Sequence, residues 1–150
     1  MSRAMARLVT AAACGIAIAS AAVPAAVAEG KSQAARSAVV FGKIQYDSPG
    51  RDDRSNRSLN DEWVTVTNTG KKAVDLSRWT LVDNERNTYR FGKLRLAPHA
   101  SVRVHTGAGR DTAKDVFQNR RAYVWNNDRD KATLRDASGR TVATAAWGRR

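Results

Sequence analysis

Two histidines are the side chains best suited to acid–base or metal chemistry in this chain. His99 lies in a predicted turn, and His105 lies on the outward face of a predicted strand. A zinc site needs further Cys, His or carboxylate ligands at suitable spacing, and none accompanies this pair. The sequence therefore predicts no metal centre and no cofactor.

Enzymatic catalysis has equally little support in the sequence. A one-histidine nuclease needs an arginine and a carboxylate near its histidine, and Arg103 beside His105 supplies only part of that set. Nothing resembling a nucleophile elbow occurs, and a Ser-His-Asp triad cannot be recognised from spacing. We expect no enzyme, and a small hydrolase or nuclease remains an alternative.

The loop over residues 47–61 is the other place where a ligand site could form. It contains the carboxylates Asp47, Asp52 and Asp53, and three arginines alternate with the last two. Loops of this length are often functional, but the three carboxylates lack the regular spacing of a calcium loop. We predict a solvated loop whose charges neutralise one another.

Positive charge is the strongest chemical signal. The chain has 26 Lys and Arg against 14 Asp and Glu, a formal net charge of +12. This charge favours polyanions such as nucleic acid, an anionic cell-wall polymer or an anionic membrane surface. Arginine-rich composition or a need for solubility would produce the same total. The candidate polyanion contacts lie on outward strand positions and in loops: Arg90, Arg103, Arg135, Lys71, Lys72, Arg120 and Arg121, with Arg149 and Arg150 at the end of the chain. The first three would form one charged face if their strands share a sheet.

Four tryptophans offer flat surfaces that could stack on sugars or bases. Trp79 is predicted to lie in the core. Trp63 is out of phase with Val64 and Val66, so it faces the other side of its strand. Trp125 and Trp147 lie near strand ends, where packing against loops is the alternative to ligand binding.

These residues must be positioned by strands, because apolar side chains alternate with polar ones and turn residues recur at short intervals. A turn is predicted at residues 68–70, because Asn and Gly tolerate positive φ at little cost. The predicted fold-specifying residues are Val64, Val66, Gly70, Trp79, Leu81, Tyr89, Phe91, Val102, Val104 and Leu134. The pattern predicts an all-β, immunoglobulin-like β-sandwich of seven to nine short strands, although alternation alone would also fit a barrel.

Two segments carry more specific predictions. The first strand is expected over residues 39–46, with Val40, Ile44 and Tyr46 facing the core and Gly42 at a bulge on that face. Residues 110–121 have weak helical character and no clear apolar stripe, so they are expected to form a loop with one helical turn.

The N-terminal segment resembles a secretory signal peptide. Arg3 and Arg7 precede an apolar, Ala-rich run over residues 8–23, and residues 26–28 form a small-x-small cleavage site. Cleavage after Ala28 would release a secreted, extracellular or wall-associated protein without a stable membrane span.

Three further expectations follow from cleavage. Cys14 would be removed, although it could alternatively be read as a lipoprotein attachment site. The formal charge would fall to +10, because Arg3 and Arg7 are lost. Residues 29–37 are expected to form a disordered tail, followed by one domain over residues 38–150.

Several local motifs resemble the lamin tail domain. They are Glu62-Trp63-Val64, Asn68-Thr69-Gly70, Val74-Asp75-Leu76-Ser77 with Trp79 and Leu81, Thr106-Gly107-Ala108-Gly109, and Trp125-Asn126-Asn127. The resemblance covers residue 39 to the C-terminus and implies an immunoglobulin-like sandwich without a catalytic motif. In lamins this domain docks protein partners and DNA. Three turns depart from the family pattern: Arg78 and His99 stand where glycine is usual, and residues 128–130 replace a Gly-Asp pair.

The sequence thus predicts a secreted, non-enzymatic binding or anchoring module for an anionic partner such as DNA or a cell-wall polymer. The alternative is an extracellular structural or protein-interaction module, docked to a cell-surface protein, whose charge serves solubility.

Overall fold

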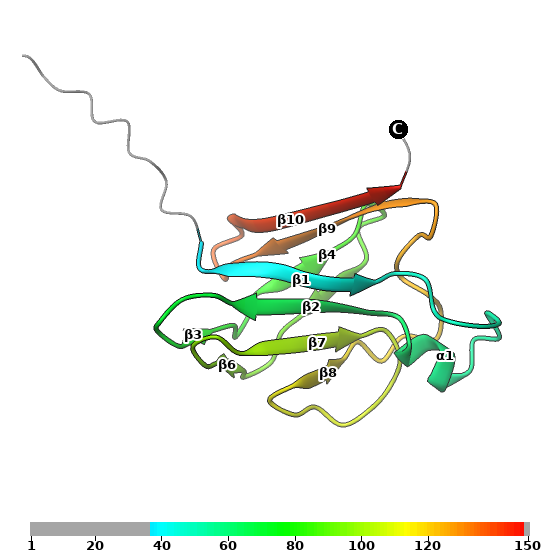
Figure 1. Cartoon of the computed structure of the whole chain (residues 1–150), viewed down its shortest axis with the longest axis horizontal. Helices are drawn as coiled ribbons and strands as arrows, with labels where there is room; N and C mark the ends of the chain where they lie inside the picture. Colours follow the sequence, from blue (N-terminus) through cyan, green and yellow to red (C-terminus); the bar gives the residue numbers. More distant parts are fainter. Residues whose placement is uncertain (1–36, 149–150) are drawn as a thin grey trace, which may run out of the picture. The chain divides into compact units, whose positions relative to one another are not determined.

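The computed structural model describes residues 37–148. The predicted signal peptide and cleavage site, Cys14, the predicted tail up to residue 36 and the terminal arginines 149 and 150 lie outside the described residues. Two four-stranded sheets form a sandwich (Figure 1). The first sheet contains, in spatial order, β1 (Val39–Gln45), β2 (Trp63–Asn68), β7 (Ser101–His105) and β8 (Asp115–Phe117). The second contains β10 (Thr141–Gly148), β9 (Arg129–Arg135), β4 (Thr80–Val82) and β5 (Thr88–Arg90). A small third sheet pairs β3 (Val74–Asp75) with β6 (Arg95–Leu96), and one helix, α1, spans Asn56–Asn60.

The predicted fold class is confirmed, and the core lies between the two large sheets. The inward side chains alternate along each strand, as in β2, where Val64 and Val66 have no exposed surface. The other predicted core residues that are buried are Leu81, Phe91, Val102, Val104 and Leu134. Trp79 and Tyr89 are only partly buried and pack against this core. The described residues form ten strands, one more than the predicted range allows, because β3, β6 and β8 are short.

The stretch 62–83 crosses from one sheet to the other and does not form a hairpin. β2 pairs with β1 and β7, whereas β4 pairs with β5 and β9. The turn after β2 needs glycine for a different reason than predicted. Gly70 does not have a positive φ, but a Cβ there would lie 2.8 Å from the Cβ of Ala38. Close approach of the chain therefore explains the glycine.

The predicted facing of β1 is wrong in its first half. Val39 is buried, whereas Val40 is exposed, and the register shifts between Phe41 and Ile44. A bulge is therefore present near Gly42, as predicted, but a Cβ on Gly42 would meet Thr65 on the outer face. The bulge reverses which side chains face inward, and a period-two reading cannot detect this change.

Two predicted loops contain regular structure. The loop 47–61 is ordered around α1, whose N-cap Ser55 accepts a hydrogen bond from the Ser58 N–H. Leu59 is buried, and the Ser58 hydroxyl lies 2.7 Å from the Tyr123 hydroxyl. Residues 110–121 contain β8, which pairs in parallel with β7, where one helical turn was expected. Non-local pairing decides the structure of this segment, because its local sequence preference is weak.

Candidate functional site

Two of the predicted polyanion contacts lie together on the outer face of the second sheet. Arg90 on β5 and Arg135 on β9 are both registered with Thr80 on the strand between them. Strands are about 4.8 Å apart, so the two Cα atoms are separated by roughly 10 Å. Both side chains are exposed. The two arginines therefore lie close together and concentrate positive charge on one face of the sheet.

Strand β9 extends this neighbourhood. Its outward positions carry Arg129, Lys131 and Arg135, and the acidic Asp130 between the first two is buried. Asp130 is the only acidic residue in the four strands of this sheet, all of which the structure describes. We call Arg90, Arg129, Lys131 and Arg135 the basic face. Sequence reasoning missed Arg129 and did not use Lys131, although alternation along the full strand would have found both.

Threonines fill the space between these cations. Thr80, Thr133 and Thr144 occupy outward positions of β4, β9 and β10. At the edge of the sheet, the Arg120 Nη2 donates to the Thr88 carbonyl oxygen over 3.1 Å. Arg120 therefore borders the basic face, and the surface combines cations with hydroxyl donors, both of which bind phosphate oxygens.

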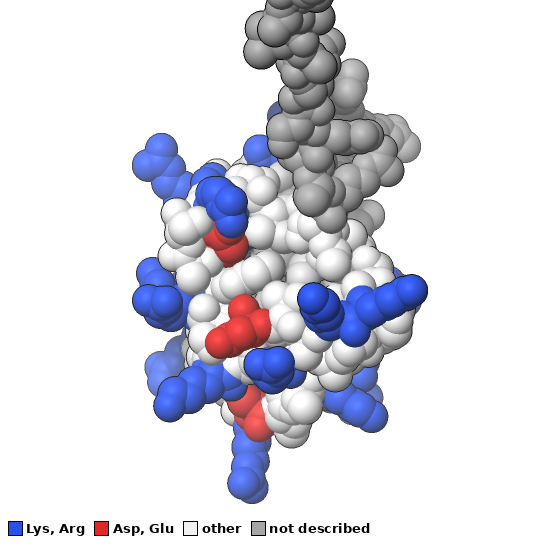
Figure 2. All heavy atoms as spheres, turned by 90° about the vertical axis from the view of Figure 1, so that its left-hand side faces the viewer, with Lys and Arg blue, Asp and Glu red and all other residues white. Residues whose placement is uncertain are grey.

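The remaining predicted contacts lie elsewhere. Arg103 is on β7 in the first sheet, so the expected face of three arginines does not form. Lys71 and Lys72 are exposed in the turn between β2 and β3, and Arg121 is exposed in the segment after β8. Figure 2 shows the end of the sandwich that carries the β2–β3 turn, where Lys and Arg stand around the rim with acidic groups between them. Charge at this end is dispersed.

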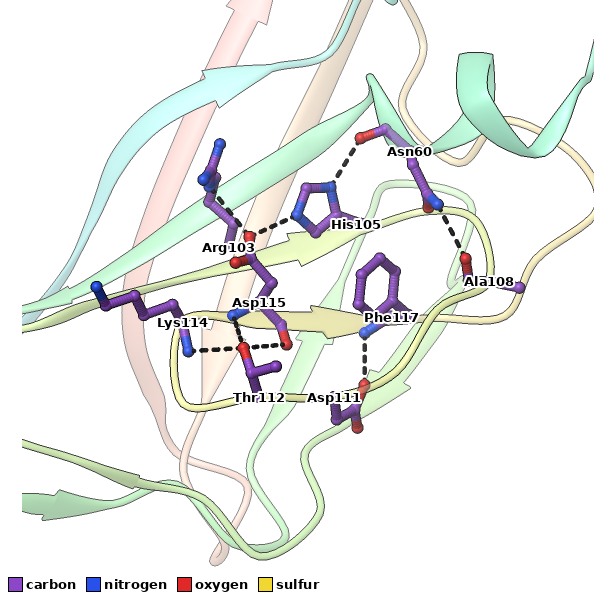
Figure 3. Close-up of polar contacts among 9 residues, drawn as sticks. All are labelled: Asn60, Arg103, His105, Ala108, Asp111, Thr112, Lys114, Asp115 and Phe117. Atoms are coloured by element: carbon purple, nitrogen blue, oxygen red, sulfur yellow. Dashed lines mark hydrogen bonds and ion pairs between the residues drawn. The ribbon is translucent and has the colours of Figure 1, made fainter.

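A polar cluster surrounds Arg103 on the outer face of the first sheet (Figure 3). The Asp115 Oδ1 lies 3.2 Å from the Arg103 Nε and 2.8 Å from the His105 Nε2. The other ring nitrogen, Nδ1, lies 2.7 Å from the carbonyl oxygen of Asn60. The parallel pairing of β7 with β8 brings Asp115 to this position, and sequence adjacency alone did not indicate it.

This cluster supports a structural role more than catalysis. Both ring nitrogens of His105 meet oxygen atoms of the protein, and its side chain is only 12% exposed. Phe117 stacks on the imidazole with ring centroids 5.0 Å apart. No ring nitrogen faces solvent, where a general base would meet its substrate. The cluster instead joins β8 and α1 to β7.

The tryptophans are engaged in packing. Trp63 faces outward as predicted and is half-buried, with Lys43 and the Arg103 guanidinium each 5.6 Å from its ring centroid. Trp147 stacks on Tyr46 with ring centroids 4.9 Å apart, and it meets the buried Trp125 edge-on at 5.7 Å. These contacts favour packing over ligand stacking for all three indoles.

Glu62 is a buried acid that sequence reasoning did not single out. Its side chain has no exposed surface, and its Oε1 accepts hydrogen bonds from the Thr106 hydroxyl at 2.5 Å and the Val124 N–H at 2.9 Å. Burial raises the pKa of this carboxyl from 4.5 to about 7, against the opposing effect of these donors. Glu62 thus links the start of β2 to the end of β7 and to the segment before β9.

Two other kinds of site are absent from residues 37–148. The structure contains no group of three or more His, Cys, Asp or Glu within this range that could hold a metal ion. Over the same range, none of its helices has the length and apolar character needed to cross a membrane.

Comparison with known families decides the classification. The family model described as Lamin Tail Domain matches residues 32–149. The chain belongs to the lamin tail domain family. The family is an immunoglobulin-like module, in agreement with the sandwich seen here. No curated protein matches the chain.

Two turns are strained at positions where the resemblance led us to expect glycine. Arg78 and His99, which replace glycines usual in the family, have φ angles of 67° and 57°. Both values fall in the left-handed region that glycine occupies without steric cost. Both turns therefore have a backbone conformation that suits glycine, although an arginine and a histidine occupy it.

Proposed function

We propose that this lamin tail domain is a secreted, non-enzymatic module that binds an anionic phosphodiester polymer, such as DNA or a phosphate-containing cell-wall polymer, on its basic face. The observation that carries the proposal is the register of Arg90 and Arg135 on either side of Thr80. Arg129 and Lys131 extend this pair along β9, and the single acidic side chain in the sheet is buried.

Binding on this face would depend on phosphate groups more than on bases. A sheet face with short threonines and flexible cations offers no projecting helix or ribbon that could enter a major groove. Arginine and threonine donors contact phosphate oxygens, and these contacts carry no sequence information. We therefore expect low sequence specificity and a strong dependence on salt concentration.

The test is binding of residues 29–150 to labelled duplex DNA across a salt series. Arg90→Gln combined with Arg135→Gln should weaken binding at low salt and reduce the slope of log K against log salt by about 2, at ~0.9 per lost phosphate contact. The matched control is Lys71→Gln combined with Lys72→Gln, which removes the same charge from the β2–β3 turn.

The control variant should retain most of the affinity for DNA and most of the slope of log K against log salt. Equal losses in the two double variants would show that net charge, and not the basic face, drives binding. Absence of binding by the parent protein to both DNA and poly(glycerol phosphate) at low salt would overturn the proposed function itself. Repeating the series with poly(glycerol phosphate) distinguishes a cell-wall ligand from nucleic acid.

Secretion is tested separately. Expression of the whole chain in a bacterial host should release a protein whose N-terminal residue is Glu29, as read by mass spectrometry of the medium. Recovery of a lipid-modified protein beginning at Cys14 would support membrane anchoring instead.

A further inference from the structure

A groove on the first sheet has no role in the proposed function. It lies between β6, the first half of β7 and the loop that precedes β8, and its volume is about 480 Å³. Its apolar lining comes from Leu96, Ala97, Ala100 and Ala113, and Thr65 and Ser101 also line it. The groove is on the opposite sheet from the basic face.

The backbone of β7 is available along one side of the groove. β8 is registered only with Arg103 to His105, whereas β7 begins at Ser101. The Arg103 N–H donates to the Lys114 carbonyl oxygen at 2.8 Å, on the side of β7 that faces β8. Since backbone groups of alternate residues point the same way, the N–H and C=O of Ser101 face the groove. These two backbone groups can pair with one residue of an added extended segment.

The position of Lys114 limits what can be added. The Lys114 carbonyl oxygen already bonds to the N–H of Arg103, only two residues beyond Ser101, so an extended segment paired with Ser101 would meet Lys114 almost at once. A long segment running alongside β7 would collide with the loop that precedes β8. The geometry therefore favours the end of a chain over an internal segment.

Charge selects which end. Arg95, Arg103 and Lys114 all line the groove. Asp115 contacts Arg103 and is shared with His105, and Asp75 is registered with Arg95 across the β3–β6 pair. Among the residues that the structure describes, Lys114 has no ion-pair partner. The positive charge of Lys114 attracts a C-terminal carboxylate at this end of the groove and repels an N-terminal ammonium group.

We propose that the groove binds the C-terminal end of an extended protein chain. The last residue pairs with the Ser101 backbone, and the terminal carboxylate meets the Lys114 ammonium, because the Arg103 guanidinium already contacts Asp115 and the Trp63 ring. An apolar final side chain packs on Ala97 and Ala113, which contribute exposed methyl groups to the groove. Backbone pairing supplies affinity, and the free carboxylate supplies selectivity for chain ends.

The probe is a pool of N-acetylated hexapeptides with randomised final residues, prepared once with free carboxyl ends and once with amides. Residues 29–150, immobilised, are expected to retain peptides with apolar final residues from the free-carboxyl pool. The strongest of these should bind ~10-fold or more tightly than its amide, the range expected for a charge-assisted hydrogen bond. Failure to retain either pool, or equal retention of both, would overturn the proposal.

Variants then locate the site. Lys114→Gln is expected to lower the affinity for the selected peptide ~10-fold, and Ala113→Trp is expected to abolish binding by filling the groove. Both positions are exposed, so folding should be retained and is checked by circular dichroism. Lys43→Gln removes the same charge from the same sheet outside the groove and should bind normally. Unchanged binding by Ala113→Trp, or displacement of the peptide by duplex DNA, would contradict a dedicated carboxylate groove.

Discussion

Replacing Glu62 with Gln should change how stability depends on pH. The wild-type carboxyl has no exposed surface, and burial raises its pKa from 4.5 to about 7. Between these values the folded protein holds a proton that the unfolded chain releases. The free energy of unfolding therefore falls as pH rises through this window, and it is highest with respect to this group below about pH 4.5.

The magnitude follows from the two pKa values. At ~1.4 kcal/mol per pH unit, a rise from 4.5 to about 7 corresponds to a loss of ~3 kcal/mol by pH 8. The amide of the Glu62→Gln variant cannot ionise, so the variant lacks this loss. Its NH₂ group replaces Oε2, which has no hydrogen-bond partner among the described residues. The variant therefore buries two unpaired N–H donors where the protonated acid buries one O–H, and this costs ~1–3 kcal/mol relative to that acid. The variant should be less stable than wild type at pH 4 and should equal or exceed it at pH 8.

Urea denaturation followed by tryptophan fluorescence at pH values from 4 to 8 measures both profiles. The informative quantity is the difference in the free energy of unfolding between wild type and variant at each pH, because the contributions of all other titrating groups cancel in it. Glu85→Gln removes a carboxyl from an exposed position and serves as the matched control, with a profile parallel to that of wild type. Parallel profiles for wild type and Glu62→Gln would refute the assignment of a proton to the buried carboxyl.

Two further predictions concern the backbone. Arg78→Gly and His99→Gly should each raise the free energy of unfolding by roughly 0.5–1 kcal/mol, because both residues hold left-handed φ angles. Thermal denaturation measures this increase as a higher Tm. A lower Tm would mean that the native side chains make compensating contacts. Gly109→Ala should destabilise by ~1–3 kcal/mol, since the new Cβ would lie 2.5 Å from the Phe117 ring. Gly92→Ala has no atom within 4 Å of its added Cβ and should change stability by less than ~0.5 kcal/mol, so similar losses in the two variants would discount the ring contact.

The sheet assignment of the strands could not be derived from local pattern. Alternation correctly placed Val64, Val66, Val102 and Val104 in the core, because each strand is half-buried and its period is visible in sequence. Which strands share a sheet depends on pairing between distant segments. Arg103 was grouped with arginines of the opposite sheet for this reason.

The polar cluster illustrates the same limit at the level of a site. Asp115 reaches His105 only because β8 pairs in parallel with β7, and the sequence around β8 carries no strong strand signal. The bulge in β1 has a similar effect, since one inserted position reverses the facing of Val40. Glu62 was recognised as part of a family motif, but its burial depends on the segment that contains Val124.

The direction of the first and last strands has a mechanical consequence. β1 and β10 run in the same direction, so the described chain enters the sandwich at one end and leaves it at the other (Figure 1). Each is paired antiparallel with its neighbour over most of its length, β1 with β2 and β10 with β9. Tension between the two ends of the domain therefore acts along these ladders in shear, and many hydrogen bonds must break together. A domain anchored at one terminus and pulled at the other would resist extension far better than a hairpin opened one bond at a time.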